Sequence, residues 1–124
     1  MQLQPQHILL HVADLAASTD FYRSLLGIEP VEPGETFVLF ALPSGLKLGL
    51  WARDDVEPAP GPAGSGVEIG FRVDSRAAVE DTFAAWQAQG VAIQHSPARV
   101  RFGYSFLALD PDGHWLRVYA LGQE

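Results

Sequence analysis

The sequence predicts an α+β fold built from two β-α-β-β-β modules. The same order of strand-like and helix-like patterns occurs twice along the 124 residues. An offset of 61 residues places His7 on Glu68 and Tyr22 on Phe83, and the offset grows to 68 towards the end of the modules. Such a spacing between similar segments is the sequence signature of a repeated structural unit.

A stretch rich in proline and glycine separates the two halves. Residues 54–66 suit neither a helix nor a strand ladder, so they are predicted to form a linker. We therefore expect one domain over residues 1–124, with module one at 7–53 and module two at 67–121. Neither module can bury both faces of its own sheet. The modules are expected to pair, within one chain or by exchange across a homodimer, into a curved mixed sheet around a cavity.

Module one begins with a strand-like run at residues 7–12. Asp14 is placed to cap the helix that follows, whose apolar residues recur at helical spacing until Gly27 ends it. Two strands are then predicted at 36–42 and 46–51, joined by a Pro-Ser-Gly turn.

Module two repeats this order. A strand is predicted at 67–73, and Asp74 or Ser75 caps a second helix that Gly90 ends. Two further strands are expected near residues 104–109 and 114–121.

Two polar segments of module two carry no functional signal in the sequence. His95 precedes Ser96 and Pro97 and is predicted to lie in a loop. Asp110 and His114 share a short segment with Asp112, so together they resemble a metal cluster. The Pro and Gly residues between them instead favour a tight turn with local Asx hydrogen bonds.

Composition and charge exclude several classes of function. The chain has no cysteine, which rules out disulfides, thiolate metal sites and a cysteine nucleophile. Its net charge of −7 is unsuited to tracking a nucleic-acid backbone. No apolar run approaches the ~18 residues of a membrane span, and the N-terminus does not resemble a signal peptide. We expect a soluble cytoplasmic protein that binds neither nucleic acid nor membrane.

Strand alternation separates two chemically different faces, because successive side chains point to opposite sides of a strand. One face is aliphatic or Phe in every predicted strand and is expected to pack on the two helices. The other face mixes aromatic rings, charges and glycines, which is the composition of a small-molecule site. Gly49 and Gly70 are expected to leave space for the ligand. A solvent-exposed face and a dimer interface are the alternatives. The predicted ligand-binding residues are His7, His11, Gly49, Trp51, Glu68, Arg72, Trp115, Arg117 and Tyr119.

These residue types suit a flat aromatic ligand. Trp51 and Trp115 offer planar surfaces for stacking. Arg117 is able to pair with a ligand carboxylate in a bidentate fork, and Arg72 adds positive charge. Glu68 leaves two other interpretations open: it neutralises Arg117 across the sheet, or it holds a cationic ligand.

The duplicated arrangement and its motifs resemble the vicinal oxygen chelate superfamily, which includes glyoxalases, extradiol dioxygenases and bleomycin-resistance proteins. The motifs are Val12-Ala-Asp14-Leu15, Ser18-Thr-Asp-Phe-Tyr-Arg23, Leu26-Gly27 and Asp110-Pro-Asp-Gly113. The resemblance covers nearly the whole chain and implies paired β-α-β-β-β modules.

The resemblance also implies where a metal would be bound. Metal-dependent members place one ligand on each of four strands, and the matching positions here are His7, Gly49, Glu68 and Arg117. Glycine has no side chain, and a guanidinium does not lose its proton in proteins. His7 and His11 lie about 13 Å apart along a strand, too far to chelate together. We therefore expect no metal, no cofactor and no catalytic residue. A glyoxalase- or dioxygenase-type enzyme of the same superfamily is the alternative.

Among the metal-free members, the chain most resembles those that confer resistance to phenazine antibiotics of the griseoluteate type. The segments that carry this likeness are Ser18–Arg23, Glu29-Pro30, Trp51, Phe102-Gly103, Phe106-Leu107, Asp110–His114 and Arg117-Val118. The likeness implies reversible sequestration of a planar aromatic compound, with no chemistry performed on it.

Overall fold

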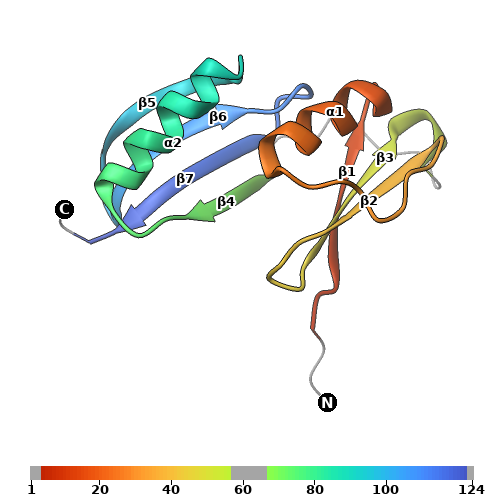
Figure 1. Ribbon diagram of the computed structural model, residues 1–124, viewed down its shortest axis with the longest axis horizontal. Helices are drawn as coiled ribbons and strands as arrows, with labels where there is room; N and C mark the ends of the chain where they lie inside the picture. Colours follow the sequence, from red (N-terminus) through yellow and green to blue (C-terminus); the bar gives the residue numbers. More distant parts are fainter. Residues whose placement is uncertain (1–3, 57–66, 123–124) are drawn as a thin grey trace. The chain divides into compact units, whose positions relative to one another are not determined.

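The computed structural model describes residues 4–56 and 67–122, in two compact units at Met1–Ala63 and Gly64–Glu124. Each unit contains one α-helix and one mixed sheet, so the α+β class and the duplicated order are confirmed (Figure 1). Most of the predicted linker at 54–66 lies outside the described residues. Its first two residues end a short 3-10 helix, η1 (Arg53–Asp55).

The first unit holds a three-stranded sheet in the order β1-β3-β2. Strand β1 runs parallel to β3, and β2 runs antiparallel to it. The elements are β1 (His7–Val12), α1 (Leu15–Leu26), β2 (Phe37–Ala41) and β3 (Lys47–Ala52). A single antiparallel bridge joins Glu32, in the segment between α1 and β2, to Leu39 of β2. In the described part of this unit, the module is therefore β-α-β-β with a residual bridge.

The second unit holds a four-stranded sheet in the order β4-β7-β6-β5, and α2 lies across one face of it (Figure 1). Strand β4 runs parallel to β7, and the other pairs are antiparallel. The elements are β4 (Glu68–Arg72), α2 (Arg76–Ala88), β5 (Ala92–Val100), β6 (Gly103–Leu109) and β7 (Trp115–Leu121). This unit has the complete β-α-β-β-β order.

His95 was predicted to lie in a loop, and this prediction is wrong. His95 and Pro97 both lie within β5. Proline lacks the amide donor of a strand ladder and is confined to edge strands and bulges. Strand β5 is the edge of its sheet, and its register with β6 shifts between His95 and Ala98. The proline is accommodated at this irregularity, so it does not mark a loop.

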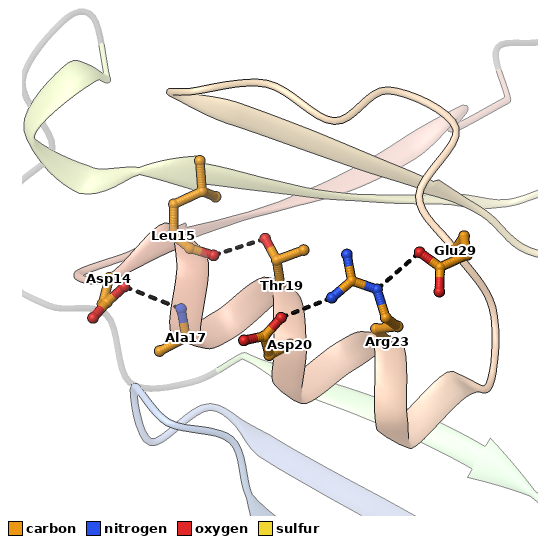
Figure 2. A network of polar contacts seen from close by, with 7 residues as sticks. All are labelled: Asp14, Leu15, Ala17, Thr19, Asp20, Arg23 and Glu29. Carbon is orange, nitrogen blue, oxygen red and sulfur yellow. Dashed lines mark hydrogen bonds and ion pairs between the residues drawn. The ribbon is translucent and has the colours of Figure 1, made fainter.

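The predicted helix ends are confirmed by capping contacts. The Asp14 carboxylate accepts a hydrogen bond from the Ala17 amide at 3.0 Å (Figure 2). Gly27 ends α1 in the left-handed conformation. Ser75, rather than Asp74, caps α2 by accepting from the Ala78 amide at 3.1 Å. These side chains satisfy amide groups that the first helical turn leaves without intrahelical partners.

The aliphatic strand faces form the core of each unit, as predicted. In the first unit, Tyr22 of α1 is buried, as are Leu50 and Phe40 of the two strands that the helix contacts. In the second unit, Trp86 of α2 makes edge-to-face contacts with Phe71 and Phe106. Burial of this apolar surface fixes which face of each sheet meets its helix. The alternate residues of every strand therefore point to the opposite face, which carries the candidate site.

Candidate ligand-binding site

Arg117 occupies the middle of the helix-free face of the second sheet. Its Nε donates to Oε2 of Glu68 at 3.0 Å, and its Nη1 donates to the Ser105 hydroxyl at 3.1 Å. Strand β7 lies between β4 and β6, so the guanidinium is held from both neighbouring strands. The Arg117 side chain is 22% exposed. This geometry confirms that Glu68 neutralises Arg117, one of the interpretations that the sequence left open.

The Arg117 guanidinium has further N–H donors that are available to a ligand. An arginine carries five N–H donors in a planar fork. Among the described residues, Nη2 of Arg117 has no hydrogen-bond partner. The site therefore presents a fixed cationic donor, already half-shielded from water.

A hollow of about 330 Å³ opens beside Arg117. This volume lies within the ~300–1,000 Å³ range of small-molecule sites. Most of its lining is apolar or uncharged, and Arg117 supplies the charge. The lining residues are His95, Ser96, Ala98, Val100, Ser105, Phe106, Leu107 and Arg117. An apolar hollow with one oriented polar group is suited to an uncharged ring system that carries a hydrogen-bond acceptor.

Arg117 is the one predicted ligand-binding residue that lines this hollow. The other predicted residues of the second unit lie near Arg117, on the same face of the sheet. Trp115 precedes Arg117 by two residues on β7 and is 43% exposed. Tyr119 follows it by two and makes an edge-to-face contact with Phe102 at 5.8 Å. Arg72 pairs in register with Tyr119 and is exposed. Residues two apart on a strand share a face. Trp115 and Tyr119 therefore lie on either side of Arg117, and Arg72 lies beside Tyr119.

The remaining predicted residues lie on the helix-free face of the first sheet. His11 pairs in register with Trp51, and the two rings meet edge to face at 6.2 Å. Phe37 contacts the same indole from β2 at 6.3 Å. His7 is exposed at the start of β1. This unit therefore has its own aromatic surface, centred on the half-buried Trp51.

The structure treats the two glycines that were expected to leave space for a ligand differently. A Cβ on Gly49 would overlap Cδ2 of Leu9 and would lie 3.1 Å from two ring carbons of Phe37. A Cβ on Gly70 would lie 3.3 Å from Cε1 of Tyr119. The prediction that Gly49 leaves room for a ligand is wrong for the structure as it stands, because the side chains of Leu9 and Phe37 close over its backbone. Gly70 is exposed, and one ring carbon of Tyr119 lies near it.

The residues at the four metal-matching positions do not fit a divalent cation. Glu68, the one carboxylate among them, already accepts from the Arg117 guanidinium at 3.0 Å. Gly49 supplies no donor, and the space above it is filled by Leu9. In residues 4–56 and 67–122, no three His, Cys, Asp or Glu side chains are grouped as metal ligands.

The turn before β7 is built by Asp110, as predicted. Its Oδ1 accepts from the amides of Asp112 at 2.9 Å and of His114 at 2.8 Å. Its Oδ2 lies 2.7 Å from Nδ1 of His114, a buried pair that the sequence analysis did not foresee. The hydrogen bond to Asp110 raises the pKa of His114.

Sequence reasoning missed most of the hollow. Half of the lining comes from strand β5, which was not predicted because Pro97 argues against a strand. The lining residues on β5 are His95, Ser96, Ala98 and Val100. Ser105 was detectable in principle. It alternates with the apolar face of β6 and pairs in register with Tyr119, a residue of the predicted ligand face.

The chain belongs to the Glyoxalase/Bleomycin resistance protein/Dioxygenase superfamily, whose family model matches residues 4–118. It is 31% identical over 122 residues to the phenazine antibiotic resistance protein EhpR of Enterobacter agglomerans. That match covers 96% of this chain and 93% of EhpR.

Solved structures share this fold. The solution NMR structure of protein ATC0852 from Agrobacterium tumefaciens is 50% identical, with a TM-score of 0.89, over 98% of this chain and 100% of that one. A glyoxalase/bleomycin resistance protein/dioxygenase from Nocardioides is 22% identical, with a TM-score of 0.85, over 100% of this chain and 91% of that one. The described helices include none with the length and apolar character needed to cross a bilayer.

Proposed function

We propose that this protein binds small planar aromatic compounds without a metal and confers resistance by sequestering them. The observation that carries the proposal is Arg117, held from two strands beside an apolar hollow, with Nη2 making no hydrogen bond to any described residue. In the proposed complex, the hollow takes the ring system and Arg117 donates to an oxygen of its substituent. An oriented donor of this kind fixes the ligand at low entropic cost, because the guanidinium is already immobilised.

The aromatic groups around the hollow support the same ligand class. Trp115 and Tyr119 lie on either side of Arg117 along β7. An aromatic contact adds about 0.5–1.5 kcal/mol beyond area burial. The 31% identity to a phenazine antibiotic resistance protein supports a tricyclic, nitrogen-containing ring system.

Titration of the purified protein with phenazine-1-carboxamide tests this proposal. We expect saturable quenching of tryptophan fluorescence, and calorimetry on the same samples gives the dissociation constant. Arg117→Gln is expected to weaken binding about tenfold, the loss of one charge-assisted hydrogen bond. Arg23→Gln is the matched control, since Arg23 also pairs with a glutamate but lies on α1. Absence of binding by phenazine-1-carboxamide and phenazine-1-carboxylate would refute the proposal.

Sequestration without chemistry is tested separately. We expect the compound to be recovered unchanged after prolonged incubation, both from the untreated protein and from protein supplied with Ni²⁺, Zn²⁺, Mn²⁺ or Fe²⁺. Elemental analysis of the purified protein is expected to find less than stoichiometric metal. A stoichiometric metal or a converted product would overturn this part of the proposal and favour an enzyme of the same superfamily.

A further inference from the structure

We infer that Glu68 is a specificity-determining residue, which makes the hollow prefer uncharged hydrogen-bond acceptors such as carboxamides over carboxylates. This inference rests on the proposed function. It assigns the charge of the ligand, which the general composition of the site leaves open.

The positive charge of the Arg117 guanidinium is already compensated by a neighbouring carboxylate. Oε2 of Glu68 accepts from Nε of Arg117 at 3.0 Å, with the two side chains 40% and 22% exposed. An isolated arginine beside a hollow would favour an anion. Here the carboxylate of Glu68 is already the anion that pairs with Arg117, so the ion pair presents little net charge to the ligand.

A carboxamide and a carboxylate interact differently with the Arg117–Glu68 ion pair. A neutral carboxamide oxygen accepts from Nη2 while the ion pair stays intact. A carboxylate approaching the same atom is repelled by Glu68, because like charges at short range disfavour each other outside bulk water. It gains the full interaction with Arg117 only by displacing Glu68, which then loses its partner.

Other charged groups on this face do not reverse that preference. Arg72 lies two register pairs from Arg117, whereas Glu68 contacts the guanidinium directly at 3.0 Å. Solvent and salt screen a charge more strongly the farther it lies from the site. The chain as a whole carries a net charge of −7, which further disfavours an anion.

A charge-neutral substitution isolates the contribution of Glu68. Glu68→Gln retains a side-chain oxygen that can accept from Arg117 and removes the negative charge. Glu29→Gln is the matched control, because Glu29 accepts from Nε of Arg23 at 2.9 Å and its loss changes the net charge equally. Figure 2 shows this second pair, between Arg23 of α1 and Glu29 in the segment that follows the helix.

Calorimetry at pH 7.5 would compare phenazine-1-carboxylate and phenazine-1-carboxamide. The wild-type protein is expected to bind the carboxamide more tightly. Glu68→Gln is expected to tighten carboxylate binding about tenfold and to change carboxamide binding less than about twofold. Glu29→Gln is expected to change neither affinity by more than about twofold.

The binding data test the specificity of Glu68 and the proposed function separately. Tighter binding of the carboxylate than of the carboxamide by the wild-type protein contradicts the inference, without reliance on any variant. An unchanged ratio of the two affinities in a folded Glu68→Gln variant also contradicts it. In both cases the proposed function stands, because planar aromatics still bind. If neither compound binds the wild-type protein, the proposed function itself fails.

Discussion

The hydroxyl of Ser105 accepts a hydrogen bond from Nη1 of Arg117 at 3.1 Å, across the antiparallel pair of β6 and β7. Ser105 is 2% exposed, so this contact lies at the protected end of the guanidinium. Together with Glu68 on the opposite side, it leaves the arginine little freedom to rotate. Preorganisation of this kind lowers the entropy that a binding site loses when its ligand arrives.

Ser105→Ala is therefore expected to weaken ligand binding and to destabilise the fold by similar free energies. Loss of one hydrogen bond lowers the free energy of unfolding by about 0.5–1.5 kcal/mol. The dissociation constant for phenazine-1-carboxamide is expected to rise about threefold to tenfold as Arg117 becomes mobile. Thermal unfolding and calorimetry measure the two effects. Ser44→Ala, in a turn of the first unit, serves as control; unchanged affinity in Ser105→Ala would show that the serine does not position Arg117.

The buried His114–Asp110 pair predicts a stability that falls as the pH rises. Its hydrogen bond to Asp110 raises the pKa of folded His114 above the 6.5 of an unperturbed histidine. The folded state then holds the proton more tightly than the unfolded state. The contribution of the pair is thus complete below pH 6.5 and is lost as the pH rises through the folded pKa.

Chemical unfolding at several pH values between 5.5 and 9 measures this effect. His114→Asn is expected to reduce the decline of the free energy of unfolding across that range, because it removes the titrating imidazole. His95→Asn removes an exposed histidine and is expected to leave the decline unchanged. A wild-type protein whose stability rises steadily from pH 6.5 to 9 would contradict the assigned direction.

Gly103 is required where β6 passes close to β7. A Cβ at this position would overlap the carbonyl oxygen of Ala120, which belongs to the neighbouring backbone and cannot move aside alone. Gly103→Ala is expected to lower the free energy of unfolding by about 1–3 kcal/mol or more, as overpacking does. Gly70→Ala is the control, since its Cβ would meet only a ring carbon of Tyr119 at 3.3 Å. Equal stability of the two variants in denaturant would refute this explanation.

The helix cap at Asp14 predicts a smaller effect. Its carboxylate accepts from the Ala17 amide at 3.0 Å (Figure 2). Asp14→Ala is expected to lower the free energy of unfolding by about 1 kcal/mol, whereas Asp14→Ser keeps most of the stability. Thermal unfolding followed by circular dichroism compares the variants. If the alanine and serine variants are equally stable, the cap contributes nothing measurable.

Local features of the fold were predictable because neighbouring residues determine them. Asp14, Gly27 and Ser75 mark the helix ends through contacts made within a few residues, so the sequence contains the whole signal. The alternation along β7 likewise separated buried Leu116 and Val118 from the ligand face. The turn built by Asp110 was predictable for the same reason.

The hollow depended on pairing between distant segments. Pro97 hid β5, because proline disfavours a strand unless an edge or a bulge accommodates it, and only the sheet order reveals that edge. The space over Gly49 was filled by Leu9, which the register of β1 with β3 brings beside it.

By itself, the sequence determined the duplicated α+β order, the helix ends and the residues on each strand face. Only the tertiary structure decided that Arg117 is held by Glu68 and Ser105, 49 and 12 residues away along the chain. The physical reason is that strand pairing sets which side chains meet across a sheet, and pairing is fixed by the packing of the whole unit.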